Sequence, residues 1–286
     1  MIETLLLLLK LSVAASIFAI GLGSTAGDLT YLLRQPGLLV RSLLAMYVLV
    51  PLAALALVAL LPLAPGVEAA LLVLAVSAGA PMLPKKLGSF GADSYLFSLV
   101  VLSSLLAIVL VPMWVAALAE LFGVAAELPP RVIALAIAKA FLLPLIAGMV
   151  LGRLWSRLAR AAEMLLAVAG TVLMACGLLL LVMNFELLRS TQSLGFFALL
   201  LLLVAALAIG HFMGGPTQDE RTALGIACAT RHIGLAALVA ASFPGPRTVT
   251  LIAVYVVASA VVTMPYLKWR KSRAAARGET GQAGSQ

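Results

Sequence analysis

One apolar stretch near the end of the chain contains ionisable side chains where a membrane span would ordinarily have none. It runs from Pro216 to Pro244, reads PTQDERTALGIACATRHIGLAALVAASFP, and has Thr230, Arg231 and His232 near its middle. A charged side chain at the centre of a bilayer is costly, so a span that only anchors the protein would not retain one. These residues therefore mark a candidate functional site.

A second stretch in the first half of the chain has the same design. Residues 67–92 form an otherwise apolar run that is interrupted by Gly79, Pro81, Pro84, Lys85 and Lys86. Two interrupted spans at corresponding places in the two halves are typical of secondary transporters, whose binding sites lie where such helices break. Broken backbone at membrane depth must line either protein or a water-filled cavity.

The acidic residues are absent from both interruptions. All eleven lie in loops, in the tail or at span ends: Glu3, Asp28, Glu68, Asp93, Glu120, Glu127, Glu163, Glu186, Asp219, Glu220 and Glu279. A cation site or a carboxylate proton relay within the membrane would normally require an acid at a mid-span position. The deep ionisable residues are basic instead, which predicts an anion-binding cavity near mid-membrane.

The predicted substrate or anion-binding residues are Lys85, Lys86, Lys139, Thr230, Arg231 and His232. Lys85 and Arg231 sit at the two interruptions, and arginine can grip a carboxylate with two parallel hydrogen bonds. The other basic residues have structural alternatives. Lys139 can extend to the outer interface, Lys86 can be a loop lysine, and His232 can be a hydrogen-bonded core histidine.

Composition predicts an all-α polytopic membrane protein. The chain has 286 residues, of which 64% are hydrophobic and 10% charged, with a mean hydropathy of +1.17. A span needs about 20 apolar residues. The sequence therefore predicts about nine transmembrane helices, at 4–26, 37–62, 67–91, 94–121, 131–153, 161–184, 193–214, 219–243 and 246–268. Residues 1–271 are expected to form one transporter domain, and residues 272–286 a disordered cytoplasmic tail.

Basic residues indicate the orientation. One predicted side carries Arg34, Arg41, Arg153, Arg157, Arg160, Arg221 and the cluster from Lys268 to Arg277, whereas the other carries Arg131, Arg189 and Arg247. The positive-inside rule then places the C-terminus in the cytoplasm and, with nine spans, the N-terminus outside. The expected location is the cytoplasmic (inner) membrane. Two GxxxG motifs, at Gly148–Gly152 and Gly210–Gly214, predict close helix packing, with contacts inside the chain favoured over a homodimer.

Three segments carry a resemblance to a known family. They are GLGSTAGDLTYLLRQPGLLVRSLLAMYVLVPLAA near the start, the AP…GSFGAD…S region after residue 79, and ERTALGIACATRHIGLAALVAASF near the end. Over nearly its whole length the chain resembles the bile acid:sodium symporter family. That resemblance implies two inverted repeats, a core domain with two crossing interrupted helices, and a panel domain that faces it. It also implies alternating-access transport of organic anions such as bile acids, steroid sulphates or small carboxylates, coupled to sodium.

The sequence departs from the family at its sodium ligands. The family's Ser-Asn pair aligns with Pro84 and Lys85, its Glu with Ala227, and its Gln-Asn pair with Arg231 and His232. A further Gln corresponds to Met46, and Ser98 alone keeps a family-like oxygen ligand. Because hard cations require several oxygen ligands, we expect no sodium, metal or other cofactor here. Proton coupling is physically available, since burial can lower the pKa of a lysine by several units.

The sequence therefore predicts a sodium-independent secondary transporter of a small organic anion, in which Lys85 and Arg231 replace the sodium site. The expected partners are that anion and the lipid bilayer, without nucleic acid. Three alternatives remain: a sodium-coupled organic anion symporter, a cation/proton antiporter, and a non-transporting membrane sensor. An enzyme is not expected, because the chain has no HExxH motif, no mid-span aspartate pair and no G-x-S-x-G elbow.

Overall fold

The fold was analysed in a computed structural model that describes residues 2–77, 93–122, 129–183, 185–189, 193–240 and 246–283. Among the described residues, six helical segments are long and apolar enough to cross a membrane: Pro36–Leu60, Ser94–Leu121, Pro130–Leu154, Ala162–Met183, Ser193–Met213 and Thr250–Arg273. Two shorter apolar helices, Leu7–Gly23 and Pro65–Val76, accompany them. The protein is a multi-pass membrane protein, as its composition predicts.

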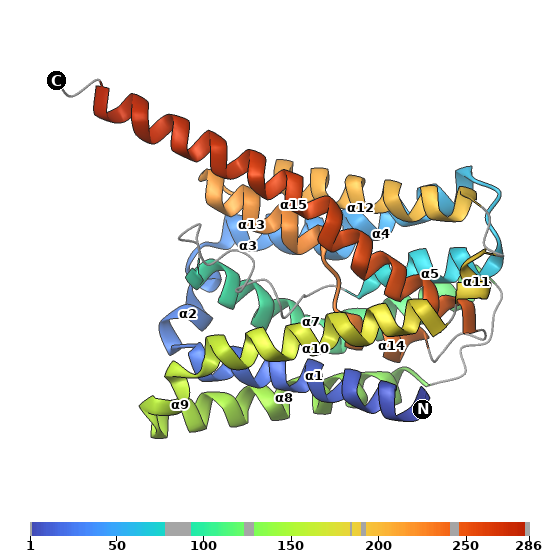
Figure 1. The fold of residues 1–286 in the computed structure, drawn as a ribbon, viewed down its shortest axis with the longest axis horizontal. Helices are drawn as coiled ribbons and strands as arrows, with labels where there is room; N and C mark the ends of the chain where they lie inside the picture. Colours follow the sequence, from blue (N-terminus) through green and yellow to red (C-terminus); the bar gives the residue numbers. More distant parts are fainter. Residues whose placement is uncertain are drawn as a thin grey trace.

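The described segments form helices throughout (Figure 1). In chain order these are α1 (Ile2–Gly23), α2 (Ala26–Thr30), α3 (Pro36–Leu44), α4 (Val50–Leu60), α5 (Pro65–Val76), α7 (Asp93–Leu121), α8 (Pro130–Leu154), α9 (Ser156–Arg160), α10 (Ala162–Met183), α11 (Phe185–Arg189), α12 (Ser193–Met213), α13 (Gln218–Ala229), α14 (Ile233–Ala240) and α15 (Pro246–Ala283). Each predicted span contains at least one of these helices. The predicted span 67–91 is described only as far as Ser77.

The second predicted span is a single helical rod with a π-helical turn, Ala45–Leu49, between α3 and α4. Pro51 follows this turn and has no backbone N–H, so the carbonyl of Tyr47, four residues earlier, lacks its usual helical donor. The indole Nε1–H of Trp114, on α7, donates to that carbonyl at 3.0 Å. The carbonyl of Tyr47 therefore keeps a hydrogen-bond partner despite the proline. The hydrogen bond from Trp114 also connects this helical rod to α7.

Helices α1, α8 and α10 pack together as one group along one side of the molecule (Figure 1). Gly148 and Gly152 of α8 face α1 so closely that a Cβ on Gly152 would lie 2.6 Å from the carbonyl oxygen of Leu22. A Cβ on Gly148 would meet the carbonyl oxygen of Phe18 and the Cα of Gly21. The first GxxxG motif therefore packs two helices of the same chain, which confirms the intrachain alternative for this motif.

The second GxxxG motif does the same in the other part of the molecule, where α12 packs against α13. A Cβ on Gly210 would lie 2.7 Å from the Cα of Gly225, and one on Gly214 would meet the backbone of Arg221. Helices α4, α5 and α15 also pack against α12, and α14 packs against α5 and α15. The interrupted helix is thus enclosed by neighbours instead of facing lipid.

The loops and helix ends that carry most of the basic residues lie at one end of the helix bundle. Figure 1 shows α2, α9, the start of α13 and the C-terminal end of α15 toward the left, with the N-terminus and α11 toward the right. This agrees with the grouping of basic residues on one side. Helix α15 is described as far as Ala283, past residue 272, where the sequence analysis places the start of the tail. Ala, Arg and Glu in this segment are good helix formers that extend an existing helix without a new nucleation cost.

Candidate functional site

The interruption predicted in the last third of the chain lies between α13 and α14. Helix α13 ends at Ala229, and Thr230 adopts an extended conformation with φ −95° and ψ 129°. The backbone N–H and the hydroxyl of Thr230 both donate to the carbonyl oxygen of Ile226, at 2.8 Å and 2.7 Å. The Thr230 hydroxyl therefore caps the end of the helix, and its proton is already committed.

The start of α13 is fixed by a capping box. Thr217 accepts from the N–H of Glu220 at 3.2 Å, and the Glu220 carboxylate accepts from the N–H of Thr217 at 3.1 Å. Glu220 is buried, and the hydroxyl of Tyr31 lies 3.5 Å from its Oε1. A carboxylate is stabilised at the positive end of a helix dipole, so Glu220 has a structural role here.

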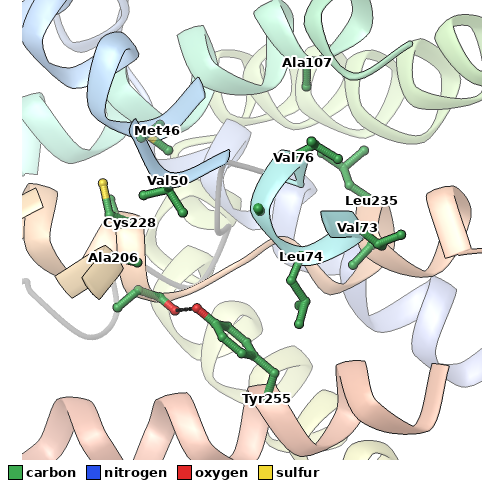
Figure 2. Packing of buried hydrophobic residues seen from close by; sticks show 14 of the residues in the cluster. Met46, Val50, Val73, Leu74, Val76, Ala107, Ala206, Cys228, Leu235 and Tyr255 are labelled. Carbon is green, nitrogen blue, oxygen red and sulfur yellow. Dashed lines mark hydrogen bonds between the residues drawn. The ribbon is translucent and has the colours of Figure 1, made fainter. Parts of the chain in front are cut away.

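Tyr255 of α15 closes the other end of α13. Its hydroxyl donates to the carbonyl oxygen of Ala229 at 2.9 Å, drawn as the dashed line in Figure 2. This bond satisfies one of the carbonyls that a helix end leaves without an intrahelical partner. Sequence analysis missed Tyr255, because one tyrosine in an apolar span carries no signal of its partner.

His232 begins α14 and joins it to the first interrupted segment. Its backbone N–H donates to the carbonyl oxygen of Ser77 at 3.1 Å, directly after the end of α5. Its ring Nδ1 accepts from the N–H of Leu235 at 3.2 Å, as an N-cap side chain does. His232 is 3% exposed. The structure thus favours the core histidine, and the Nδ1 contact assigns the ring proton to Nε2.

Arg231, between Thr230 and His232, is 5% exposed and has no partner for its charge among the described residues. Its Nε, Nη1 and Nη2 are all buried and make no hydrogen bond. Tyr47, Cys228 and Tyr255 lie close enough to interact electrostatically with the guanidinium, and the Tyr255 hydroxyl approaches it most closely in the manner of a hydrogen-bond partner. None of these contacts has the distance and angle of a formed hydrogen bond, so the three guanidinium nitrogens have no such bond. A buried guanidinium with all five donors idle is costly unless a ligand takes them.

Arg270 shows that buried arginines in this protein do not all lack hydrogen-bond partners. It is 6% exposed, close to the value for Arg231. Its Nε donates to the Thr222 hydroxyl at 2.7 Å and its Nη2 to the carbonyl oxygen of Gln218 at 2.8 Å. The two arginines are therefore equally buried but differ in whether the protein itself supplies acceptors.

Cys228 and Leu235, on either side of the interruption that contains Arg231, lie among apolar side chains (Figure 2). Met46 and Val50, from the rod formed by α3 and α4, lie beside Cys228, and Val76 lies beside Leu235 (Figure 2). Met46 and Ala227, both predicted at the family's sodium ligand positions, are fully buried and carry no oxygen in their side chains. The site combines one permanent positive charge with an apolar wall.

The remaining predicted site residues lie apart from this group or outside the described residues. The hydroxyl oxygen of Ser98 accepts from the N–H of Leu32 at 3.1 Å, at the start of a 3₁₀ turn. Lys139 is exposed on α8, away from the buried face that includes Ile137 and Phe141. This agrees with the alternative in which Lys139 extends to the interface. Pro84, Lys85 and Lys86 lie in the segment 78–92, outside the described residues.

The first comparison with known proteins concerns the family. The sequence model of the sodium bile acid symporter family matches residues 10–208, which is more than half of the chain. The chain belongs to the sodium bile acid symporter family. Its membership confirms the resemblance seen in the sequence and makes the protein a membrane transporter by family. No curated protein matches the chain.

The family match ends within α12, so α13 and α14 follow it. Met46 and Ser98 fall inside the matched segment, whereas Ala227 and Arg231 lie beyond it. The alignment of Arg231 with a sodium ligand of the sodium bile acid symporter family therefore rests on the resemblance of residues 220–243 alone. The burial and the missing partners of Arg231 are independent of that alignment.

Proposed function

We propose that the protein is a sodium-independent secondary transporter, which carries a small organic anion across the cytoplasmic membrane by alternating access. Arg231 provides the charge that holds the anion, and the apolar wall beside it receives the rest of the molecule. The substrate class is a bile acid, a steroid sulphate or a small carboxylate. The C-terminus lies in the cytoplasm and the N-terminus outside.

The observation that carries this proposal is the buried guanidinium of Arg231, which has no acceptor among the described residues. Planar guanidinium groups bind carboxylate and sulphate oxygens through two parallel hydrogen bonds, and such charge-assisted bonds are about twice as strong as neutral ones. A bound anion would satisfy the idle donors and neutralise the charge. The sequence adds Lys85 as a second cation of the same site.

The case against sodium comes from the side chains at the family's ligand positions. Sodium requires several oxygen ligands, by the same logic that governs other hard cations. Met46 and Ala227 offer none, and the oxygen of Ser98 already accepts a hydrogen bond from Leu32. The fixed positive charge of Arg231 would also repel a cation at this place.

The packing supports a division into two moving parts. Helices α1, α8 and α10 form the panel domain in this proposal, and α12 to α14 belong to the core domain with α4 and α5, whereas α15 packs against both α10 and α5. The breaks of the crossing helices lie in the core, so a motion of the core against the panel would expose Arg231 to either side in turn.

Sodium-coupled transport is the second candidate, and the description of the matching family favours it. The two candidates are separated by uptake into proteoliposomes that contain the purified protein, with sodium replaced throughout by choline. Three radiolabelled probes represent the substrate classes: cholate, estrone sulphate and pyruvate. We expect uptake of at least one probe at an unchanged initial rate in choline. Strict dependence on sodium would favour the second candidate.

A further inference from the structure

We infer that the protein works as an anion exchanger, in which the loaded carrier crosses between its two states quickly and the empty carrier slowly. This inference rests on the proposed function, because it concerns the same site. It assigns the transport mode, which neither the family nor the fold determines. The observations behind it concern what remains around Arg231 when no anion is bound.

The hydroxyl groups close to Arg231 are already used by the backbone. Tyr255 donates to the carbonyl oxygen of Ala229, and Thr230 donates to that of Ile226. The hydroxyl of Tyr47 donates to the carbonyl oxygen of Ser103. Each of these groups stabilises the end of a helix or the contact between two helices. The oxygens of these hydroxyl groups keep lone pairs that could accept from the guanidinium, but the nitrogens of Arg231 form no hydrogen bond with them.

Among the described residues, no acid forms a hydrogen bond with Arg231. Residues 78–92, which follow α5, include Lys85 and Lys86 but no aspartate or glutamate, and residues 241–245 are ASFPG. The nearest acid along the same helix is Glu220, at the far end of α13. Eleven residues of helix separate it from Arg231 by about 16 Å. None of the described residues therefore places a carboxylate on Arg231 in place of the anion.

The consequence is a difference in charge between the two forms of the carrier. With a monovalent anion bound, the guanidinium of Arg231 has a counter-charge and its donors are satisfied, so the loaded site carries one positive charge fewer than the empty site, with or without Lys85. When the site is empty, the rearrangement must carry a buried and uncompensated positive charge through apolar surroundings. Moving such a charge to mid-membrane is costly even by the lowest insertion scales, so the return of the empty carrier becomes the slow step. Exchange avoids that step, because an anion occupies the site in both directions.

Counterflow in sodium-free proteoliposomes tests this inference. Vesicles are loaded with unlabelled cholate, estrone sulphate or pyruvate, or left without anion, and uptake of the same labelled probe is followed from outside. We expect loaded vesicles to take up the transported probe about tenfold faster or more, since each tenfold corresponds to a modest change in barrier height. Equal rates in loaded and empty vesicles would overturn the exchange inference while leaving the proposed function intact. Absence of uptake in both, with uptake restored by sodium, would instead refute the proposed function.

Variants of Arg231 test whether its charge causes the difference in uptake between loaded and empty vesicles. Arg231→Lys keeps a positive charge, and we expect it to keep the ratio of loaded to empty uptake above about fivefold. Arg231→Met removes the charge, so residual uptake should show a ratio close to one. Arg270→Met is the matched control, because it removes an equally buried arginine whose donors are satisfied. A ratio that falls in Arg270→Met as far as in Arg231→Met would contradict the assignment to Arg231.

Discussion

The backbone N–H of His232 donates a hydrogen bond of 3.1 Å to the carbonyl oxygen of Ser77. This bond joins the start of α14 to the residue after α5, so the two interrupted segments meet although 155 positions separate these residues in the chain (232 minus 77). Arg231 precedes His232 directly. The charged residue is therefore held by backbone contacts from both halves of the protein, and its position does not depend on a side-chain partner.

The first prediction concerns the stability of the empty protein. Arg231→Met should leave the apparent melting temperature equal to or above that of the wild type, because it removes a buried charge that no group satisfies. Arg270→Met should lower the free energy of unfolding by about 1–3 kcal/mol, because it removes two hydrogen bonds from a charged donor. Thermal unfolding in detergent measures both. Strong destabilisation by Arg231→Met would mean that the protein itself neutralises Arg231.

His232 provides a test between a helix cap and a proton carrier. Asparagine is a good N-cap residue but does not titrate, so His232→Asn should retain transport and stability. His232→Leu should destabilise the protein by about 1 kcal/mol, since the N–H of Leu235 then loses its acceptor. Uptake and thermal unfolding of the two variants give the comparison. Loss of transport in His232→Asn with normal stability would instead indicate that the imidazole carries a proton.

The packing of α8 on α1 predicts opposite effects for two glycines. Gly148→Ala should destabilise the protein by about 1–3 kcal/mol, because the added methyl meets the backbone of Phe18 and Gly21. Gly177→Ala, in α10, is the control, because no atom lies within 4 Å of its added Cβ. Alanine there should be neutral or stabilising by about 0.5–1 kcal/mol. Equal effects of the two substitutions would refute the close contact at Gly148.

Asp28, in the first turn of α2, should give a pH-dependent contribution to stability. Burial raises the pKa of its carboxyl, but hydrogen bonds from Ser94 and Thr25 outweigh burial and bring this pKa below the ordinary 3.8. A lowered folded pKa stabilises the protein above the unfolded pKa, and this contribution is lost as the pH falls through the folded value.

The variant Asp28→Asn should therefore be less stable than the wild type at neutral pH, by about 1 kcal/mol or less. The difference should shrink as the pH falls below about 4. Ser94→Ala should raise the pKa of Asp28 and bring this convergence to a higher pH. Melting temperatures across an acid pH series provide the measurement. A difference between wild type and Asp28→Asn that stays constant through pH 4 would contradict the assignment.

The helix positions could be predicted from the sequence where apolar length decides them. The predicted spans 131–153, 161–184 and 193–214 differ from α8, α10 and α12 by one residue at each altered end. The break near Thr230 was also predictable, because a charged residue inside a membrane span is costly and indicates that the segment is not a plain lipid-facing helix. The length of α15 beyond residue 271 was not predicted, because polar composition does not by itself separate a helical tail from a disordered one.

The interior of the site could be predicted only in part. A buried arginine was predictable from its place in the span, but its lack of acceptors depends on where Tyr47 and Tyr255 direct their hydroxyl groups. The orientation of the two hydroxyl groups is set by tertiary contacts with the carbonyl oxygens of Ser103 and Ala229. No local sequence pattern predicts these contacts. Similarly, the sequence left His232 open between a ligand and a core histidine, and only the structure shows that its ring Nδ1 accepts the N–H of Leu235.

The initial rate of anion uptake as a function of sodium concentration tests the central claim most directly. Choline replaces sodium at constant ionic strength in proteoliposomes, and the probe that shows the highest uptake is used. The account predicts that the rate is the same at every sodium concentration, including zero, and that Arg231→Met strongly reduces it. A rate that vanishes without sodium and rises to saturation as sodium is added would contradict the account.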